Sequence, residues 1–201
     1  MRCRLALLAA GCVAFPGREG AAQGTLAAFS YSVSIPSGHT REFTNHTSLI
    51  GLSIAGRRFL GSALSVGLDL GWNELYWKTS QPLRVGNATV SGQQYRDLNI
   101  FPLFLSTHFY LGHARGFRPY LGVNAGGYYI VQRFTVGLSE IEADHWHLGL
   151  APEAGILIPL GEGWNAILTG KYHYPLEAGN YLGGSRSFRY ISIGVGLAAR
   201  R

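Results

Sequence analysis

The stretch "PYLGVNAGGYYI" at residues 119–130 alternates between two kinds of side chain. The apolar residues share one parity: Leu121, Val123, Ala125 and Tyr129. The small and polar residues share the other parity with two tyrosines: Tyr120, Gly122, Asn124, Gly126 and Tyr128. Because successive side chains of an extended chain point to opposite faces, this segment predicts a strand with one apolar face.

The same alternation recurs along most of the chain. We expect eight strands, over residues 25–35, 47–57, 62–77, 95–111, 117–133, 145–160, 164–174 and 187–198. In the third of these, Leu64, Val66 and Leu68 alternate with small or polar residues. A period of two that persists in this way predicts strands rather than helices.

The composition of the two faces indicates which solvent each face meets. A face made mostly of glycine and serine is not expected to form a hydrophobic core, so the apolar face must meet an apolar surrounding. Lipid is such a surrounding, and in lipid every backbone polar group needs an internal partner, so the sheet must close. We therefore predict an all-β fold: an eight-stranded antiparallel up-and-down transmembrane β-barrel. A soluble ligand-binding barrel of the lipocalin type is the alternative.

The predicted connections alternate between long and short. The short ones span residues 58–61, 112–116 and 161–163. The long and polar ones span residues 36–46, 78–94, 134–144 and 175–186. Transmembrane barrels show this asymmetry, with short periplasmic turns and longer external loops.

Aromatic residues cluster near the predicted strand ends, as the two interfaces of a membrane would favour. Those near the long loops are Tyr76, Trp77, Tyr95, Tyr129, Trp146, Tyr174 and Phe188. Those near the short turns are Phe59, Phe109, Phe117 and Trp164.

Residues 1–22 have the layout of a secretory signal peptide. Arg2 and Arg4 precede an apolar run, and small residues stand before an expected cleavage point after Ala22. We expect residues 23–201 to form the mature barrel domain. Both cysteines lie in this leader, and lipid attachment at Cys12 is the alternative reading of "LAAGC".

The formal charge of the chain is +6, and its basic residues are scattered along the sequence. Nucleic-acid binding is therefore not expected, because it requires a clustered basic surface. We expect no cofactor.

Three segments resemble a known family: "SVGLDLGWNELYW" (65–77), "FRPYLGVNAGGYYI" (117–130) and "LAPEAGILIPL" (150–160). They are similar to the small bacterial outer-membrane β-barrel proteins grouped with the membrane domain of outer membrane protein A. The resemblance covers about residues 26 to 198. It implies an integral protein of the bacterial outer membrane, in contact with outer-membrane lipid and lipopolysaccharide and inserted by the barrel-assembly machinery. One departure is the ending "GLAARR", where such chains often have an aromatic residue.

Charged residues on the inward parity are candidates for a network in the lumen. These are Arg57, Asp69, Glu153 and Lys171, with Arg118 near the periplasmic rim. Because buried charges are costly unless they are paired, we expect salt bridges that plug the barrel. A gate for small ions is the alternative, although an eight-stranded barrel is only wide enough for its own side chains.

The segment "EIEADHWH" (140–147) is a candidate metal site. Its potential ligands are Glu140, Glu142, Asp144, His145 and His147. Oxygen ligands suit Ca²⁺ or Mg²⁺, which would bridge lipopolysaccharide phosphates. A solvated acidic loop is the alternative.

We expect a structural or surface-interaction role, with the long loops as the contact surface and no catalysis. A narrow channel or a small-ligand-binding barrel is the alternative. A lipid A-modifying enzyme is a further one, in which Ser139, Glu142, His145 and His147 would have to form the site, although their spacing matches no recognisable catalytic arrangement.

Overall fold

The computed structural model describes residues 24–79, 83–85, 88–90, 94–112, 116–136, 139–178 and 188–201. The predicted signal peptide, with both cysteines, lies outside these residues, as do parts of the predicted long loops.

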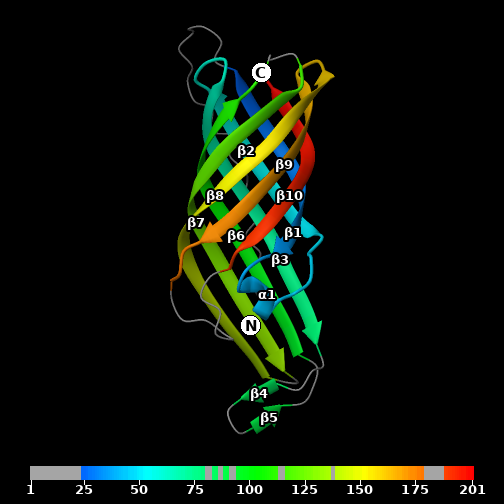
Figure 1. The fold of residues 1–201 in the computed structure, drawn as a ribbon, viewed down its shortest axis with the longest axis vertical. Coiled ribbons are helices and arrows are strands. Elements are labelled where there is room, and N and C mark those ends of the chain that lie inside the picture. The colour runs from blue at the N-terminus through cyan, green and yellow to red at the C-terminus, as the bar shows by residue number, and fades with distance from the viewer. Residues whose placement is uncertain are drawn as a thin grey trace, which may run out of the picture.

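Eight strands form one closed antiparallel barrel (Figure 1). They are β1 (Thr25–Pro36), β2 (Ile50–Phe59), β3 (Leu64–Thr79), β6 (Gln94–Tyr110), β7 (Arg118–Val136), β8 (Ser139–Gly161), β9 (Trp164–Pro175) and β10 (Tyr190–Arg200). Around the barrel they follow the order β1-β10-β9-β8-β7-β6-β3-β2, so each strand lies between its neighbours in the sequence of barrel strands. The predicted up-and-down barrel of eight strands is confirmed.

The barrel closes where β1 pairs with β10. Leu26 lies opposite Arg200 at one end of this seam, and Pro36 lies opposite Tyr190 at the other. Every strand of the barrel thus has a hydrogen-bonded neighbour on both sides, which is the arrangement that an apolar solvent requires.

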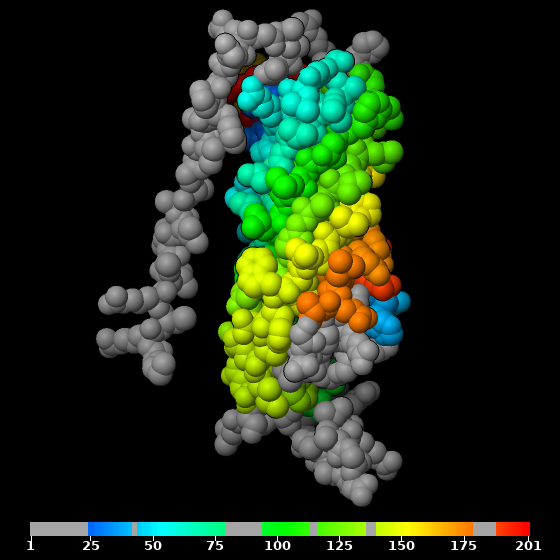
Figure 2. Space-filling model, turned by 90° about the vertical axis from the view of Figure 1, so that its left-hand side faces the viewer, coloured from blue at the N-terminus to red at the C-terminus, as the bar shows by residue number. Residues whose placement is uncertain are grey.

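The large apolar side chains cover the outside of the barrel. Leu68 is 47% exposed, Val123 53% and Ile193 47%. A soluble barrel would bury these residues in its interior, whereas here they face outward from three different strands. The space-filling view shows the strands crossing this outer surface obliquely (Figure 2).

The wall is longer on one side of the barrel. The strands β3, β6, β7 and β8 contain 16 to 23 residues, whereas β1, β2, β9 and β10 contain 10 to 12. The longer strands project past the others at the end that carries the long connections, which we call the loop end (Figure 1). The opposite end, with the short turns, we call the turn end.

The prediction of a long loop at residues 134–144 is wrong. The strand β7 continues to Val136 and β8 begins at Ser139, so most of this segment is a regular hairpin. Arg133 lies opposite Glu142 in the ladder, and its Nε is 2.7 Å from Oε2 of Glu142. Cross-strand pairing of opposite charges stabilises a polar strand that lacks an apolar face.

Two of the other long connections contain short elements. The helix α1 (Thr40–Phe43) lies between β1 and β2, and the hairpin of β4 (Leu83–Val85) and β5 (Ala88–Val90) lies between β3 and β6 (Figure 1). No helix in the described ranges is long and apolar enough to cross a membrane.

The turn between β8 and β9 requires its glycines. Gly161 and Gly163 have φ angles of 108° and 82°, and Glu162 between them has a φ of 48°. Side chains rarely tolerate such backbone conformations, which glycine adopts freely. The sequence "GEG" therefore reverses the chain within three residues.

Two of the aromatic residues expected at the membrane interfaces point into the barrel instead. Phe59 is fully buried, and Phe188 is 1% exposed. Phe59 has the inward parity of β2, as Arg57 does, and Phe188 lies two residues before the inward Tyr190, just outside β10. Outward positions are confirmed by exposure for these members of the two sets: Tyr76, Trp146, Phe109, Phe117 and Trp164.

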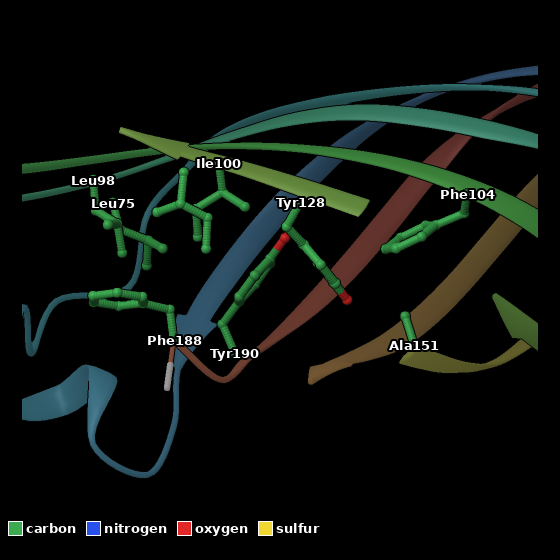
Figure 3. Close-up of a cluster of buried hydrophobic side chains, with 9 residues drawn as sticks. Leu75, Leu98, Ile100, Phe104, Tyr128, Ala151, Phe188 and Tyr190 are labelled. Carbon is green, nitrogen blue, oxygen red and sulfur yellow. The ribbon is translucent and has the colours of Figure 1, made fainter. Parts of the chain in front are cut away.

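Apolar and aromatic side chains fill both ends of the lumen, contrary to the expectation that the inward face forms no hydrophobic core. The loop-side cluster consists of Leu75, Leu98, Ile100, Phe104, Tyr128, Ile130, Ala151, Phe188 and Tyr190 (Figure 3). The turn-side cluster consists of Leu26, Ala28, Ala55, Phe59, Tyr110, Tyr120, Leu157, Ile167 and Ala198. The interior is therefore layered, with polar residues between two apolar clusters.

Candidate functional site

Two ion pairs cross the lumen between the apolar clusters. Nη2 of Arg57 lies 2.8 Å from Oε1 of Glu153, and Nζ of Lys171 lies 2.6 Å from Oδ2 of Asp69. In the closed order, β2 and β8 are diametrically opposite strands, and so are β3 and β9. Each ion pair therefore joins two opposite walls of the barrel.

Glu153 is the centre of this network, which we call the lumen network. Its side chain is fully buried. Its Oε1 accepts hydrogen bonds from Arg57, from the Tyr120 hydroxyl at 2.9 Å and from Thr169 Oγ1 at 3.0 Å. Its Oε2 lies 3.0 Å from Nδ2 of Asn124, 3.1 Å from Nε2 of His108 and 3.7 Å from Nζ of Lys171. A buried carboxylate with this many donors is fully compensated.

A second polar group continues the lumen network toward the loop end. Oδ1 of Asn73 accepts hydrogen bonds from the hydroxyls of Ser32 and Ser34, at 3.1 and 3.0 Å. Nδ2 of Asn73 donates to the Tyr190 hydroxyl at 3.3 Å. We did not predict these roles from the sequence, although Asn73 has the same parity as Asp69, which was the available signal.

His173 connects this group with the loop-side cluster. Its ring stacks on that of Tyr190 with the centroids 4.1 Å apart, and its Nε2 lies 2.9 Å from Oγ of Ser192. All of these groups are buried. Ser192 and His173 are thus enclosed inside the barrel on the neighbouring strands β10 and β9, and Nδ1 of His173 lies 3.4 Å from the Tyr128 hydroxyl of β7.

Arg118 lies apart from the other predicted members of the lumen network. It is the first residue of β7 and is paired in register with Leu157, four residues along β8 from Glu153. Four residues of a strand span about 13 Å. The rings of Phe59 and Tyr110 lie 5.0 and 4.6 Å from the guanidinium carbon of Arg118. The structure therefore brings together Arg57, Asp69, Glu153 and Lys171, and places Arg118 at the turn end.

A small cavity lies beside the ion pairs. A cavity lined by Arg57, Asp69, Glu153 and Lys171 has a volume of about 10 Å³. A single water molecule needs at least about that much space. This cavity beside the lumen network thus has room for about one water molecule.

The candidate metal ligands of residues 140–147 do not converge. Glu140 and Glu142 lie on the outer face of β8, within 3.8 and 2.7 Å of Nε of Arg133. Asp144, also on the outer face, accepts a hydrogen bond from the Tyr129 hydroxyl at 2.9 Å. His147 is buried on the inner face, where its Nδ1 lies 2.9 Å from the carbonyl oxygen of Leu176, and His145 shares its parity. Over the described ranges, no three side chains of His, Cys, Asp and Glu are arranged to hold a metal ion.

Two of the residues considered for an enzyme that modifies lipid A lie on opposite faces of β8. Glu142 lies on the outer face and His147 on the inner face of the same strand. A wall of the barrel therefore separates these two groups, which a catalytic pair would bring within hydrogen-bond distance.

No protein family matches the sequence of the chain, and no curated protein does either. Solved structures do match it. Neisserial surface protein A is 14% identical with a TM-score of 0.58, over 90% of this chain and 99% of that one. The outer membrane protein OprG of Pseudomonas aeruginosa is 16% identical with a TM-score of 0.55, over 90% and 97%. A major outer membrane protein of Thermus thermophilus is 14% identical with a TM-score of 0.58, over 89% and 99%.

The chain has the fold of the small outer-membrane β-barrels. At these identities the comparison concerns the fold alone, and it agrees with the closed strand order and the apolar outer surface. Within this fold, the lumen network is a set of paired charges between two apolar layers.

Proposed function

We propose that this chain is an integral outer-membrane protein with a structural and surface-contact role. In this role the barrel spans the membrane as a sealed wall, and the loop end presents the contact surface. The single observation that carries the proposal is the filled lumen, in which two cross-lumen ion pairs lie between two apolar clusters.

The filled lumen favours this role over a channel. An ion passing through would have to cross Phe59 and Tyr110 at the turn end and Phe188 and Tyr190 at the loop end. Between them it would also have to separate Arg57 from Glu153. Breaking a buried ion pair costs several kcal/mol, about 3–5 when one partner is lost. These obstacles among the described residues favour a sealed barrel over a channel that conducts steadily.

The loop end supports the surface-contact part of the proposal. The hairpin of β7 and β8 continues past Trp146 and carries exposed charges on its outer face, among them Arg133, Glu140 and Glu142. Strand pairing sets the positions of these charges relative to one another, because Arg133 lies opposite Glu142 in the ladder. Together with the connections at 36–46, 78–94 and 175–186, this hairpin would form the surface that meets lipopolysaccharide or an external partner.

Planar-bilayer recording tests the sealed wall. The purified protein and its Glu142→Gln and Glu153→Ala variants are each added to the bilayer. A gel of unboiled samples first confirms that each protein is folded. We expect no conductance steps from the wild type or from Glu142→Gln, whose substitution lies outside the lumen. Glu153→Ala removes the centre of the lumen network and should give brief, irregular openings. Steady unitary currents from the wild type would instead establish a channel.

Two measurements on cells test the rest of the proposal. Trypsin added to intact cells should cleave at the loop end, for example after Lys78, and should reach the turn end only after the membrane is permeabilised. The mass spectrum of lipid A should be the same with and without expression of the protein, because the proposed role has no catalytic step. A new lipid A species that depends on expression would replace this proposal with an enzymatic one.

A further inference from the structure

Arg118 is a buried cation at the turn end whose hydrogen bonds are incomplete. Its side chain belongs to a residue that is only 2% exposed, and its Nη2 donates to the carbonyl oxygen of Ser62. Its Nε and Nη1 are buried and have no hydrogen-bond partner. Buried polar groups nearly always have a hydrogen-bond partner, because a buried donor without one loses its hydrogen bonds to water and gains none within the protein. Arg118 thus has two buried hydrogen-bond donors that the described residues leave unused.

A second arginine lies next to Arg118. The guanidinium carbons of Arg118 and Arg200 lie 5.0 and 4.8 Å from the ring centroid of Phe59. Both charges are therefore within about 10 Å of each other, which is the Debye length in 0.1 M salt. Like charges at this separation repel, and an anion between them would relieve the repulsion.

No acidic side chain neutralises Arg118 from within the barrel. Over the part of the chain that the structure describes, the carboxylates that form ion pairs do so with other partners. Glu153 is directed at Arg57, His108 and Lys171, and it lies four residues along β8 from Leu157, the register partner of Arg118. Arg118 is therefore a buried cation that forms no ion pair with a carboxylate of the described residues.

We propose that Arg118 and Arg200 form a binding site for a phosphate group at the turn-end mouth of the barrel. A phosphate group presents several acceptor oxygens in a tetrahedral arrangement, which matches the planar fork of N–H donors on a guanidinium group. Phe59 and Tyr110 form the apolar base of the site and separate the anion from Glu153. The phosphate group is either dissolved inorganic phosphate or the headgroup of a lipid in the adjacent leaflet. The site itself does not depend on whether the barrel conducts.

NMR spectroscopy of the arginine side chains tests this proposal directly. The full chain, labelled with ¹⁵N-arginine, is folded in maltoside micelles, which contain no phosphate. The Nε resonance of Arg118 is assigned by its loss in Arg118→Lys, which keeps the charge. Inorganic phosphate is then titrated at constant ionic strength against chloride. We expect a saturable shift of the Arg118 resonance, and an apparent affinity about tenfold weaker or worse in Arg200→Gln, since charged hydrogen bonds of this kind are lost.

A matched control variant and a second experiment in lipid bilayers distinguish the possible sources of the phosphate group. Arg133→Gln removes the same charge from the loop end and should leave the titration unchanged. In the second experiment, the protein is placed in bilayers of phosphatidylcholine or of a galactolipid without phosphate. A shifted Arg118 resonance in phosphatidylcholine alone identifies a lipid headgroup, and a shift in both bilayers only after phosphate is added identifies the free anion. An Arg118 resonance that responds equally to chloride and phosphate, and is identical in the two lipids, would overturn the proposal. A shift in gel migration between the unboiled and the boiled sample confirms that each variant is folded.

Discussion

Arg57 and Glu153 meet in the middle of the lumen from opposite walls of the barrel, with 2.8 Å between Nη2 and Oε1. The two residues are 96 positions apart in the chain. With the pair of Lys171 and Asp69, this contact braces the barrel across two diameters.

Removing one partner of this brace should be more harmful than removing both. Arg57→Ala leaves the buried carboxylate of Glu153 without its main partner, and we expect a loss of about 3–5 kcal/mol in the free energy of unfolding. The double variant Arg57→Ala with Glu153→Ala should lose less than the sum of the two single changes. Guanidinium unfolding in lipid vesicles, followed by tryptophan fluorescence, measures all three. Additive losses would show that the pair is not coupled.

The exposed pair at the loop end provides a contrast. Glu142→Gln removes an ion pair of the same type, with 2.7 Å between Nε of Arg133 and Oε2 of Glu142, but on side chains that are about half exposed. Such surface pairs contribute about 0–1 kcal/mol. The unfolding curve of Glu142→Gln should therefore nearly overlie that of the wild type, and a loss as large as that of Arg57→Ala would contradict the distinction.

A charge on the outer surface tests which solvent that surface meets. Leu105 is 71% exposed and lies in register with Leu68 and Ala125. In a bilayer, Leu105→Arg near the midplane should cost about 2–4 kcal/mol, whereas in a soluble barrel a surface change of this kind stays within about 0.5 kcal/mol. Leu111→Arg is the matched control, because Leu111 is 48% exposed and has the same outward parity as Leu105 but lies just past the end of β6 at the turn end. Its cost should be about 0–1 kcal/mol.

Two neighbouring glycines should respond differently to a methyl group. A Cβ on Gly67 would collide with the carbonyl oxygen of Gly56 and approach within 2.9 Å of Cα of Arg57, whereas a Cβ on Gly56 would have nothing within 4 Å. We expect Gly67→Ala to cost about 1–3 kcal/mol through overpacking. Gly56→Ala should be neutral or stabilising by up to about 1 kcal/mol. Unfolding curves in vesicles compare the two, and equal effects would mean that the lumen wall is not packed as described.

Divalent cations should leave the stability of the protein unchanged. The carboxylates of Glu142 and Asp144 are occupied by Arg133 and Tyr129, and His147 lies on the other side of the wall. Millimolar Ca²⁺ or Mg²⁺, or a chelator, should therefore not move the temperature at which the folded gel band disappears. A saturable rise in that temperature, lost in Glu142→Gln, would restore the metal hypothesis.

The period-two pattern was sufficient to predict the strands, because inward and outward residues meet different surroundings along the whole barrel. The same parity correctly placed Leu68 outside, and it would have placed Phe59 inside as well. The error at Phe59 came from treating every aromatic residue near a strand end as an interfacial one. Parity is the stronger signal, since it follows from backbone geometry rather than from composition.

Parity alone could not predict which inward charges meet. It places Arg57, Asp69, Glu153 and Lys171 on the inner face, but their heights depend on the stagger between strands, which the sequence does not display. The hairpin at residues 134–144 was missed for a related reason. A run of acidic residues resembles a loop until Arg133 is seen to lie opposite Glu142.

The cross-lumen braces also have a consequence for the lifetime of the folded protein. In an open sheet, strands four positions apart are separated by about 19 Å, so neither pair can form before β1 meets β10. Interactions that are absent from the folding transition state slow unfolding and leave the rate of folding nearly unchanged. The buried ion pairs would thus slow the unfolding of an inserted barrel, while the rate at which the barrel folds and inserts stays nearly the same.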